Sequence, residues 1–213
     1  MTARFTLHGI WLSGPTYKVG LCLRLAGEPF DYVQINLPAG EHKSPDYVAM
    51  HRYGQVPLLV DNQNGRRLVQ SAAILEYLAD TLGRFGGNSL DERLHVREWM
   101  YWEFDRLATN VYRARGARLG FRPTPEVMLE DLMGQGRTAL GVLDRHLAGR
   151  DWLVGEGPTI ADIDIYGVVA YAPEAGYDLS LTPNLQAWMG RIAALPNYLG
   201  PQDCLPKQTQ AAA

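Results

Sequence analysis

The sequence is poor in cysteine, in long apolar runs and in excess charge of either sign. Its two cysteines, Cys22 and Cys204, have neither metal-site spacing nor the number needed for a disulfide framework. A reducing, cytoplasmic compartment is therefore the simplest setting. No run approaches the ~18 apolar residues that a membrane helix requires. The net charge of −3 gives no general attraction to nucleic acid. Membranes, nucleic acids and metal ions are therefore not expected as partners.

The composition favours a chain with a sizeable core, because 46% of its residues are hydrophobic and 20% are charged. In the first 82 residues, strand-like and helix-like patterns alternate. The expected strands cover 4–10, 30–36, 57–61 and 67–69, and the expected helices cover 15–26, 45–51 and 71–82. This order matches a thioredoxin-like α/β domain, in which helices cover both faces of a four-stranded mixed sheet.

The second half shows only helical patterns, and a glycine-rich segment at 83–90 separates it from the first. We predict a thioredoxin-like domain at 1–82, a linker at 83–90 and an all-helical domain at 91–213. One long amphipathic helix is marked by Val96, Met100, Glu103, Leu107 and Val111, and a second by Leu132, Ala139, Leu143 and Leu147. Two more helices are expected to start at Thr159 and near Pro183.

The hexapeptide GQVPLL at 54–59 places a proline at the start of an expected strand. Proline removes one ladder donor. A cis Val56–Pro57 bond is the expected resolution, because the cis form costs only ~0.5–1 kcal/mol before proline. Such a bond turns the N–H and C=O of Val56 outward, where they can pair with an extended peptide as an added strand would. A plain turn before the strand is the alternative.

Two further polar sequences precede expected helices. At Gln70-Ser71, Ser71 can cap the helix, and free N–H groups at the positive helix end can hold a carboxylate. The loop before the first helix contains Ser13, whose hydroxyl can donate a hydrogen bond to a thiolate beside the helix N-terminus. Singly, each is also consistent with an ordinary cap or loop. Together with the proline loop they fall on one rim of a thioredoxin-like sheet.

These motifs resemble those of the glutathione transferases. Gln55-Val56-Pro57 and Gln70-Ser71 match that family's peptide-binding loop and γ-glutamyl-binding turn. The segment SGPTYKV at 13–19 resembles the active-site segment of its serine-type zeta and theta classes. The sequence PTIADI at 158–163 resembles the capping box that opens a core helix of the family's second domain. The resemblance extends from about residue 5 to residue 198.

The resemblance implies that glutathione is the co-substrate, and it gives each motif a role. Ser13 is then the catalytic hydroxyl that activates the glutathione thiol. Val56, aided by Pro57, holds the cysteinyl part through its backbone. Gln70 and Ser71 hold the carboxylate and amine of the γ-glutamyl end.

The glycyl end of glutathione is expected to meet His42, Lys43 and the nearby Gln55, because a positive or donor group suits its carboxylate. A solvated loop is the alternative for His42 and Lys43. The chain departs from the family just here, because HRY at 51–53 replaces the usual Asn-Pro. This departure affects the end of the second helix and the glycyl-end contacts.

One hydroxyl beside a helix end is enough to activate the thiol. A free thiol has a pKa near ~8.5, and lowering it by about two units takes roughly 2.7 kcal/mol. A hydroxyl donor to a charged acceptor supplies ~1.5–3 kcal/mol and a helix N-terminus ~0.3–1 kcal/mol more. Neither a base nor a metal is required. Ser13 is the predicted donor and Thr16 the second candidate, whereas Tyr17 falls inside the expected helix.

The electrophile is expected to bind between the domains. Trp11 borders the active-site loop, and an aromatic stripe on the first C-terminal helix could line an apolar pocket; the stripe consists of Tyr101, Phe104, Ala108 and Tyr112. Core or dimer surface is the alternative for this stripe. Glu103 lies on the other, buried-looking stripe and needs a partner there.

The sequence thus predicts a glutathione transferase that joins the glutathione thiolate to a small electrophile. A glutathione-dependent cis-trans isomerase like maleylacetoacetate isomerase is one alternative, although the zeta-class loop has Ser-Ser-Cys where this chain has Ser13-Gly14-Pro15. A non-catalytic glutathione-fold binding protein is the other. A homodimer is expected from the resemblance alone.

Overall fold

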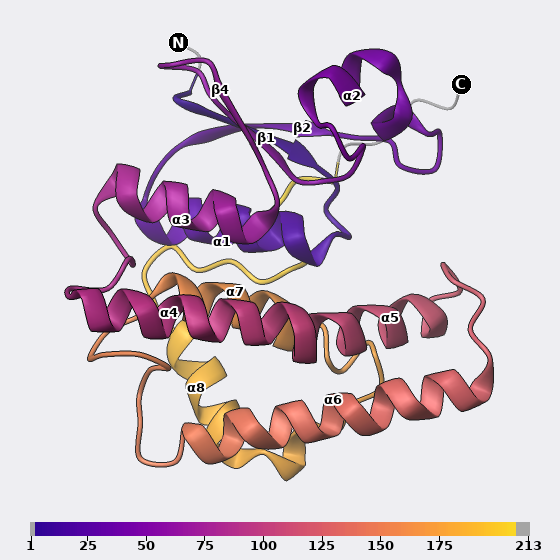
Figure 1. Ribbon diagram of the computed structural model, residues 1–213, viewed down its shortest axis with the longest axis vertical. Helices are drawn as coiled ribbons and strands as arrows, with labels where there is room; N and C mark the ends of the chain where they lie inside the picture. Colours follow the sequence, from indigo (N-terminus) through magenta and orange to yellow (C-terminus); the bar gives the residue numbers. More distant parts are fainter. Residues whose placement is uncertain (1–2, 208–213) are drawn as a thin grey trace. The chain divides into compact units, whose positions relative to one another are not determined.

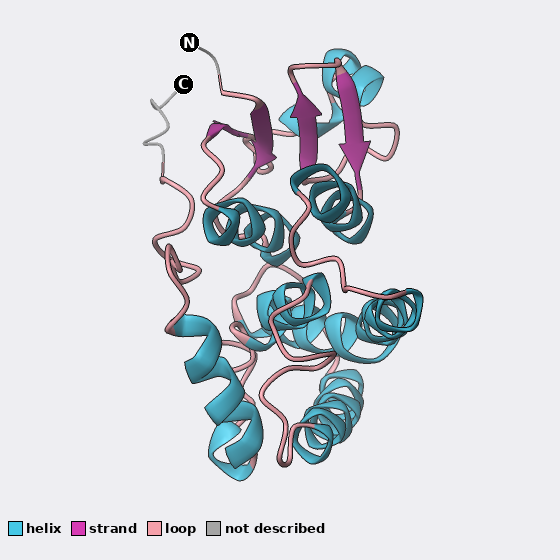
Figure 2. Ribbon diagram, turned by 90° about the vertical axis from the view of Figure 1, so that its left-hand side faces the viewer, coloured by secondary structure: helices cyan, strands magenta, loops and turns pink. Residues whose placement is uncertain are grey.

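The computed structural model describes residues 3–207, which form two compact units (Figures 1 and 2). The first unit contains residues 3–82 together with 196–207, and the second contains Gly83–Leu195. The predicted helical domain extended to residue 213, whereas residues 196–207 group with the first unit. No helix in the described part of the chain combines the length and apolar character that crossing a membrane requires.

The first unit has the predicted order β-α-β-α-β-β-α. Its elements are β1 (Phe5–Gly9), α1 (Gly14–Ala26), β2 (Phe30–Gln34), a 3₁₀ turn (Glu41–Lys43), α2 (Pro45–Met50), β3 (Leu58–Asp61), β4 (Arg66–Val69) and α3 (Ser71–Leu82). The strands form one mixed sheet in the order β2-β1-β3-β4, with β1 and β2 parallel and the other pairs antiparallel. Helices α1 and α3 lie side by side on one face, and α2 covers the other (Figure 1). The predicted thioredoxin-like domain is confirmed.

Local signals in the sequence set the ends of α1. Ser13 has extended backbone angles, and its side chain accepts the Thr16 N–H, while Pro15 follows in the first turn. Gly27 ends the helix with φ 71°, a left-handed conformation that favours glycine, and its N–H returns to the carbonyls of Arg24 and Leu23.

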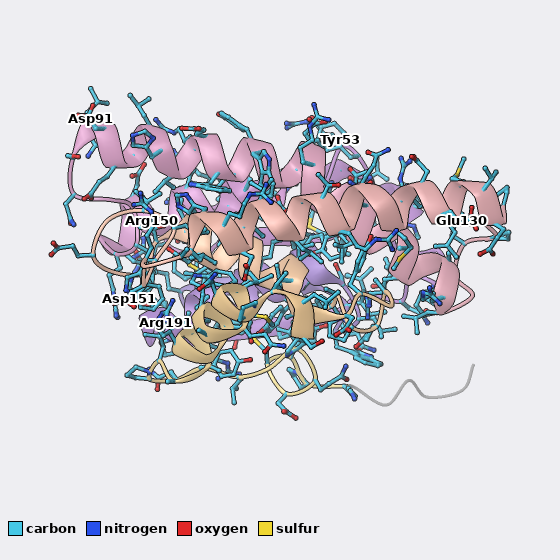
Figure 3. All side chains as sticks on the ribbon, turned by 90° about the horizontal axis from the view of Figure 1, so that it is seen from below. Tyr53, Asp91, Glu130, Arg150, Asp151 and Arg191 are labelled. Atoms are coloured by element: carbon cyan, nitrogen blue, oxygen red, sulfur yellow. The ribbon has the colours of Figure 1, made fainter. Side chains whose placement is uncertain are left out.

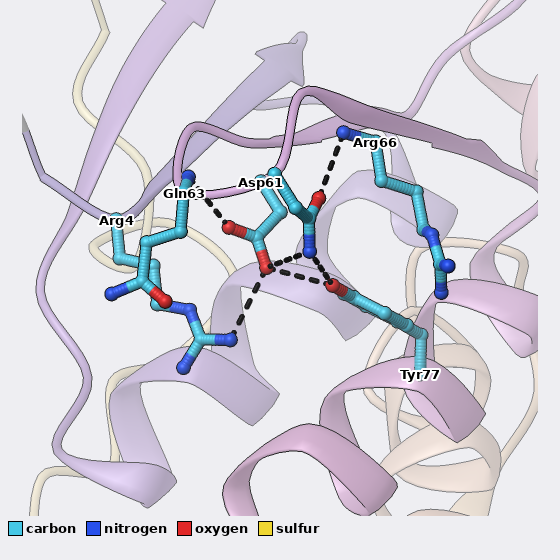
Figure 4. A network of polar contacts seen from close by, with 6 residues as sticks. Arg4, Asp61, Gln63, Arg66 and Tyr77 are labelled. Carbon is cyan, nitrogen blue, oxygen red and sulfur yellow. Dashed lines mark hydrogen bonds and ion pairs between the residues drawn. The ribbon is translucent and has the colours of Figure 1, made fainter.

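A network around Asp61 closes the end of the sheet where β3 turns into β4 (Figure 4). The fully buried carboxylate of Asp61 accepts hydrogen bonds from the Tyr77 hydroxyl at 2.7 Å, the Gln63 N–H at 2.9 Å and Arg4 at 3.2 Å. Burial by itself raises the pKa of Asp61, but these hydrogen bonds outweigh it and hold the pKa below its usual value. Since Tyr77 lies on α3, the network fixes that helix to the sheet.

The segment 196–207 packs along α1. The Tyr17 hydroxyl donates to the Leu199 carbonyl at 3.0 Å, and Cys204 and Leu205 are buried against the helix. Gly20 permits this approach, because a Cβ there would lie 2.9 Å from Leu205 Cδ2 and 3.2 Å from Cys204 Sγ. A sequence segment far from α1 therefore completes the core of the first unit.

The second unit is helical throughout its regular elements. These are α4 (Leu90–Trp102), a π-helical segment (Glu103–Ala108), α5 (Thr109–Arg118), α6 (Glu126–His146), α7 (Ile160–Val169), a 3₁₀ turn (Leu179–Leu181) and α8 (Pro183–Ala193). The predicted apolar stripes on the first two helices are confirmed as buried. The two remaining helices begin where the sequence predicts them.

Two polar clusters fix the helices of the second unit. The predicted capping box is confirmed, because Thr159 and Asp162 cap each other, and Asp162 also accepts hydrogen bonds from Leu153 N–H and from Trp188 Nε1. On α8, Arg191 donates to the carbonyls of Asp151 at 3.0 Å and Arg150 at 2.9 Å, and the three residues lie together in Figure 3. The loop after α6 is thereby attached to α8.

Candidate functional site

Three segments with polar sequence motifs meet at one end of the sheet. The strand register pairs His8 with Leu58 and Leu58 with Val69. The loop that follows β1, the loop that leads into β3 and the turn that follows β4 therefore meet the sheet at neighbouring positions. These are the segments that contain Ser13, Val56 and Gln70. The Asp61 network lies at the opposite end, where Phe5 pairs with Asp61.

Ser13 occupies the N-cap of α1 with a half-buried side chain. Its Oγ accepts the Thr16 N–H at 3.2 Å. A hydroxyl that accepts one hydrogen bond still has its own proton to donate. The helix end adds a positive potential at the same place. Ser13 can therefore donate to an anion in front of the helix while it caps the helix.

The two other hydroxyls of this segment point elsewhere. Thr16 is fully buried, and its side chain packs against Gly9, where a Cβ would come within 2.6 Å of Thr16 Oγ1. Tyr17 is also fully buried, and its hydroxyl donates to Leu199. Of the three hydroxyls, Ser13 has the most accessible position.

The predicted cis bond between Val56 and Pro57 is present, so the plain-turn alternative is wrong. Val56 lies two residues before the β3 ladder begins at Leu58. The loop is held from the side of α2, because the Tyr47 hydroxyl donates to the Gln55 carbonyl and Lys43 Nζ donates to the Gly54 carbonyl, both at 2.8 Å. Hydrogen bonds therefore hold the two residues that precede Val56 in the chain.

The turn after β4 differs in one detail from the prediction. Helix α3 begins at Ser71, and the Gln70 carbonyl accepts the Ile74 N–H at 3.0 Å, so Gln70 and not Ser71 stands at the capping position. Gln70 has φ 72°, in the left-handed region that costs a non-glycine residue free energy. Ser71 is consequently the first helical residue, where N–H groups have no partner inside the helix. This arrangement suits a carboxylate at the helix end.

The candidates for the glycyl end lie close to the proline loop. His42 is half-buried, its Nδ1 is buried without a hydrogen-bond partner among the described residues, and its carbonyl lies 2.8 Å from the position of a Cβ on Gly54. Lys43 and Gln55 are exposed, although Lys43 donates to Gly54. The structure therefore brings His42 and Lys43 to the loop that contains Gln55.

His51, which stands where the sequence departs from the family pattern, also lies beside the proline loop. Only 1% of its surface is exposed, and its ring stacks on that of Tyr47 with the centroids 5.9 Å apart. Its Nδ1 accepts the Tyr53 N–H at 3.3 Å. The available signal was the polar residue at the position where the family usually has Asn, next to the proline loop.

The residues predicted for the electrophile have different environments within their own units. Trp11 is half-buried, with the Lys207 ammonium 4.3 Å from its ring centroid. Tyr101 and Phe104 are 69% and 71% exposed, whereas Ala108 is buried. Tyr112 donates to the Gly167 carbonyl at 2.9 Å.

The π-helical segment changes the helical period inside the predicted aromatic stripe. The four positions therefore do not form one evenly exposed stripe. Their role toward an electrophile stays a prediction. No cluster of three or more potential metal ligands occurs among residues 3–207.

The fold is a thioredoxin-like domain, with the three polar segments at one end of its sheet, followed by a helical domain. Residues 3–80 match the model of the glutathione S-transferase N-terminal domain, and residues 112–196 match that of the C-terminal domain. The chain therefore belongs to the glutathione S-transferase family, whose members bind glutathione as a substrate.

Individual relatives agree with this assignment. Glutathione S-transferase GST-4.5 of Xanthomonas campestris is 32% identical over 82% of this chain and 86% of its own length. The maleylacetoacetate isomerase of Rhizobium meliloti is 31% identical over 93% of this chain and 95% of its own. The crystal structure of a glutathione S-transferase from Pseudomonas fluorescens superposes with a TM-score of 0.87 at 31% identity, covering 94% of this chain and 100% of the other.

Proposed function

We propose that this protein is a glutathione transferase in which the Ser13 hydroxyl and the N-terminus of α1 stabilise the glutathione thiolate. The observation that carries the proposal is the position of Ser13, half-buried at the N-cap, with its proton available for donation. It lies at the same end of the sheet as Val56 and Gln70. The Thr16 N–H polarises the hydroxyl that it donates to, which strengthens the donation to the sulfur.

The reaction follows from this arrangement. The thiol proton leaves to water, since Ser13 remains protonated as the donor. The thiolate forms a carbon–sulfur bond to the electrophilic carbon, and the leaving group departs with the electron pair of its bond. Stabilisation of the thiolate by ~2–3 kcal/mol lowers the thiol pKa by about two units, enough to make the thiolate the main form near neutral pH.

Glutathione would lie with its γ-glutamyl end at the start of α3 and its cysteinyl part along Val56. The free N–H groups at Ser71 suit the γ-glutamyl carboxylate, and the exposed Gln70 side chain lies beside them. The buried Nδ1 of His42 supports a contact with the glycyl carboxylate, and the Lys43 charge adds attraction there.

The test is turnover of a chloronitrobenzene with glutathione, followed by absorbance of the product. Conjugation at a rate that depends on enzyme concentration is the expected result. Tight binding of glutathione with no conversion of any electrophile or cis-olefinic acid would remove both catalytic proposals and leave a binding protein.

A second candidate function is the isomerisation of a cis-olefinic acid with glutathione as cofactor. The 31% identity to the Rhizobium meliloti maleylacetoacetate isomerase over nearly the whole chain favours it. Addition of the thiolate to the double bond allows rotation, and its elimination restores glutathione. Conversion of a cis-olefinic acid such as maleylacetone with glutathione unchanged in amount would support this function, and consumption of glutathione would support the first.

We also propose that the protein is a homodimer, as its family resemblance implies. Apolar side chains project from the outer face of α4 and the segment after it; they are Leu90, Leu94, Tyr101 and Phe104, between 52% and 71% exposed. The spacing of Leu90, Leu94 and Tyr101 fits a helix–helix contact. Light scattering is expected to give twice the chain mass, and the double substitution Tyr101→Glu with Phe104→Glu is expected to give monomers. A monomeric wild-type protein refutes the proposal.

A further inference from the structure

His51 connects both ends of the loop that presents Val56. The His51 carbonyl accepts the Gly54 N–H at 2.7 Å, and its Nδ1 accepts the Tyr53 N–H at 3.3 Å. Backbone hydrogen bonds from its own residue and from Pro57 also act on the ring and raise its pKa. A neutral ring with its lone pair on Nδ1 accepts the Tyr53 N–H.

The surroundings of His51 hold the intervening residues as well. The His51 ring stacks on Tyr47, whose hydroxyl donates to the Gln55 carbonyl at 2.8 Å. Lys43 donates to the Gly54 carbonyl at the same distance. The backbone at positions 54, 55 and 57 is therefore fixed from the side of α2, which leaves the other side of Val56 for a ligand.

We propose that His51 is a positioning residue for the glutathione-binding loop, and that only its neutral form holds the loop in the conformation that binds glutathione. The inference rests on the proposed function, since it assumes that Val56 binds the peptide backbone of glutathione. The proposal predicts that glutathione binding weakens in acid because His51 is protonated, and not because of the glutathione thiol.

The chemistry of the buried ring gives the direction of this effect. Protonation places a second N–H on Nδ1, directly opposite the Tyr53 N–H, and removes the acceptor that Tyr53 needs. Burial lowers the pKa of His51, the charges of Arg52 and Lys43 act in the same direction, and the hydrogen bonds to the backbone oppose them only in part. The ring is therefore neutral near neutral pH. As the pH falls, proton uptake is coupled to opening of the loop.

Other titratable groups on this side of the sheet act differently. His42 lies at the expected glycyl end, apart from the bonds that His51 makes. Burial lowers the pKa of His8 on β1, and the charge of Glu41 opposes this in part. Burial raises the pKa of Tyr47 to about 12, so its hydroxyl remains a donor at every pH of interest. Of these groups, His51 is the one that loses an acceptor for the loop backbone when it is protonated.

The test measures binding of S-methylglutathione, which has no thiol to titrate, by calorimetry between about pH 5.5 and 8. In the wild-type protein we expect the dissociation constant to rise as the pH falls through the lowered pKa of His51, by at most about tenfold per pH unit, the limit for one coupled proton. His51→Gln replaces the imidazole with an amide that does not titrate, so its dissociation constant should stay nearly constant. His51→Ala should bind weakly at every pH.

Two control variants separate His51 from the other imidazoles. His95→Gln removes an exposed histidine on α4 and should retain the wild-type pH dependence. His42→Gln should retain the weakening in acid even if its overall affinity falls. An identical pH dependence in His51→Gln and the wild type would overturn the inference. Failure of the wild type to bind S-methylglutathione at any pH would instead refute the proposed function.

A direct spectroscopic measurement keeps the inference testable if His51→Gln does not fold. His51→Asn, which can place an acceptor near Nδ1, is the second variant and should also remove the pH dependence. In the wild type, long-range ¹H–¹⁵N spectra should show an unprotonated Nδ1 at neutral pH. Saturating S-methylglutathione should move the titration of His51 to lower pH, and an unchanged titration would overturn the inference.

Discussion

Replacement of Ser13 by alanine tests the proposed activation of the thiol. The Ser13 hydroxyl has two roles in the structure, because its oxygen accepts the Thr16 N–H at 3.2 Å while its proton remains available. Ser13→Ala removes both. Loss of a donor to a charged acceptor costs about 1.5–3 kcal/mol. At 1.36 kcal/mol per pKa unit, the pKa of the bound thiol should rise by about one to two units.

The expected kinetic loss follows from that shift. Because the bound thiol is mainly thiolate at pH 7 in the wild type, the thiolate fraction, and with it kcat/KM, should fall by about 3- to 25-fold, while the affinity for glutathione changes little. Thiolate absorbance of the enzyme–glutathione complex, followed against pH, measures the pKa directly. Ser13→Thr keeps the hydroxyl and should restore most of the lost thiolate.

The loss of the helix cap must be separated from the loss of the donor. Ser89 is a matched control, because its Oγ accepts the Glu92 N–H at 3.1 Å at the start of α4. Ser13→Ala and Ser89→Ala should each lower the free energy of unfolding by about 1 kcal/mol, but only the first should change the thiol pKa. If the bound thiol titrates at the same pH in Ser13→Ala and the wild type, the hydroxyl is not the activating group.

Three further substitutions probe the surroundings of the site. Gln70→Gly removes the free-energy cost of a side chain at φ 72°, so it should raise the free energy of unfolding by up to about 1 kcal/mol while it weakens glutathione binding. A lower free energy of unfolding would contradict the inference that Gln70 is strained. Tyr77→Phe removes a 2.7 Å bond to Asp61 and should cost about 1.5–3 kcal/mol near neutral pH. The pKa of Asp61 is lowered on folding, so the difference in the free energy of unfolding should be present above about pH 4 and disappear as the pH falls through the folded-state pKa. Urea unfolding of both proteins at several pH values measures this difference. Gly20→Val should displace the segment 196–207 from α1. Burial raises the pKa of the Cys204 thiol to about 12, so its displacement should make this thiol react faster with an aromatic disulfide. Gly190→Val, with no neighbour near its Cβ, should leave that rate unchanged.

Much of the first unit could be predicted because its signals are local. A serine before a proline marks the start of α1, and a glycine marks its end. The sequence NQNG at 62–65 marks the β3–β4 turn. The expected ranges differ from the observed ones by at most two residues at either end, and the helix at 71–82 coincides. For the strands, the pairing partner decides where each ladder ends. The proline before β3 indicated the cis bond, although the hexapeptide at 54–59 was also consistent with a plain turn.

The sequence predicted that the three motifs lie at one end of the sheet, and their detailed geometry came only from the structure. From the sequence, Ser13 is the first candidate for the donor and Thr16 the second, and burial separates them further, since Thr16 is fully buried against Gly9. The helix after β4 covers the expected residues 71–82, but Gln70 takes the capping position that was expected for Ser71, and it does so with a positive φ. For His51 the sequence offered only its departure from the family pattern, because the role of the residue depends on the surrounding Tyr47, Tyr53 and Pro57.

The sequence by itself determined which segments are strands and helices and which residue types stand beside the helix ends, because periodicity, caps and turns depend on neighbours a few positions away. The tertiary structure decided what lies side by side. It paired Leu58 with His8 and Val69, which gathers the three motifs, and it returned the segment 196–207 to α1. It also introduced the π-helical segment at Glu103–Ala108. Such outcomes depend on packing between distant segments, which no local pattern encodes.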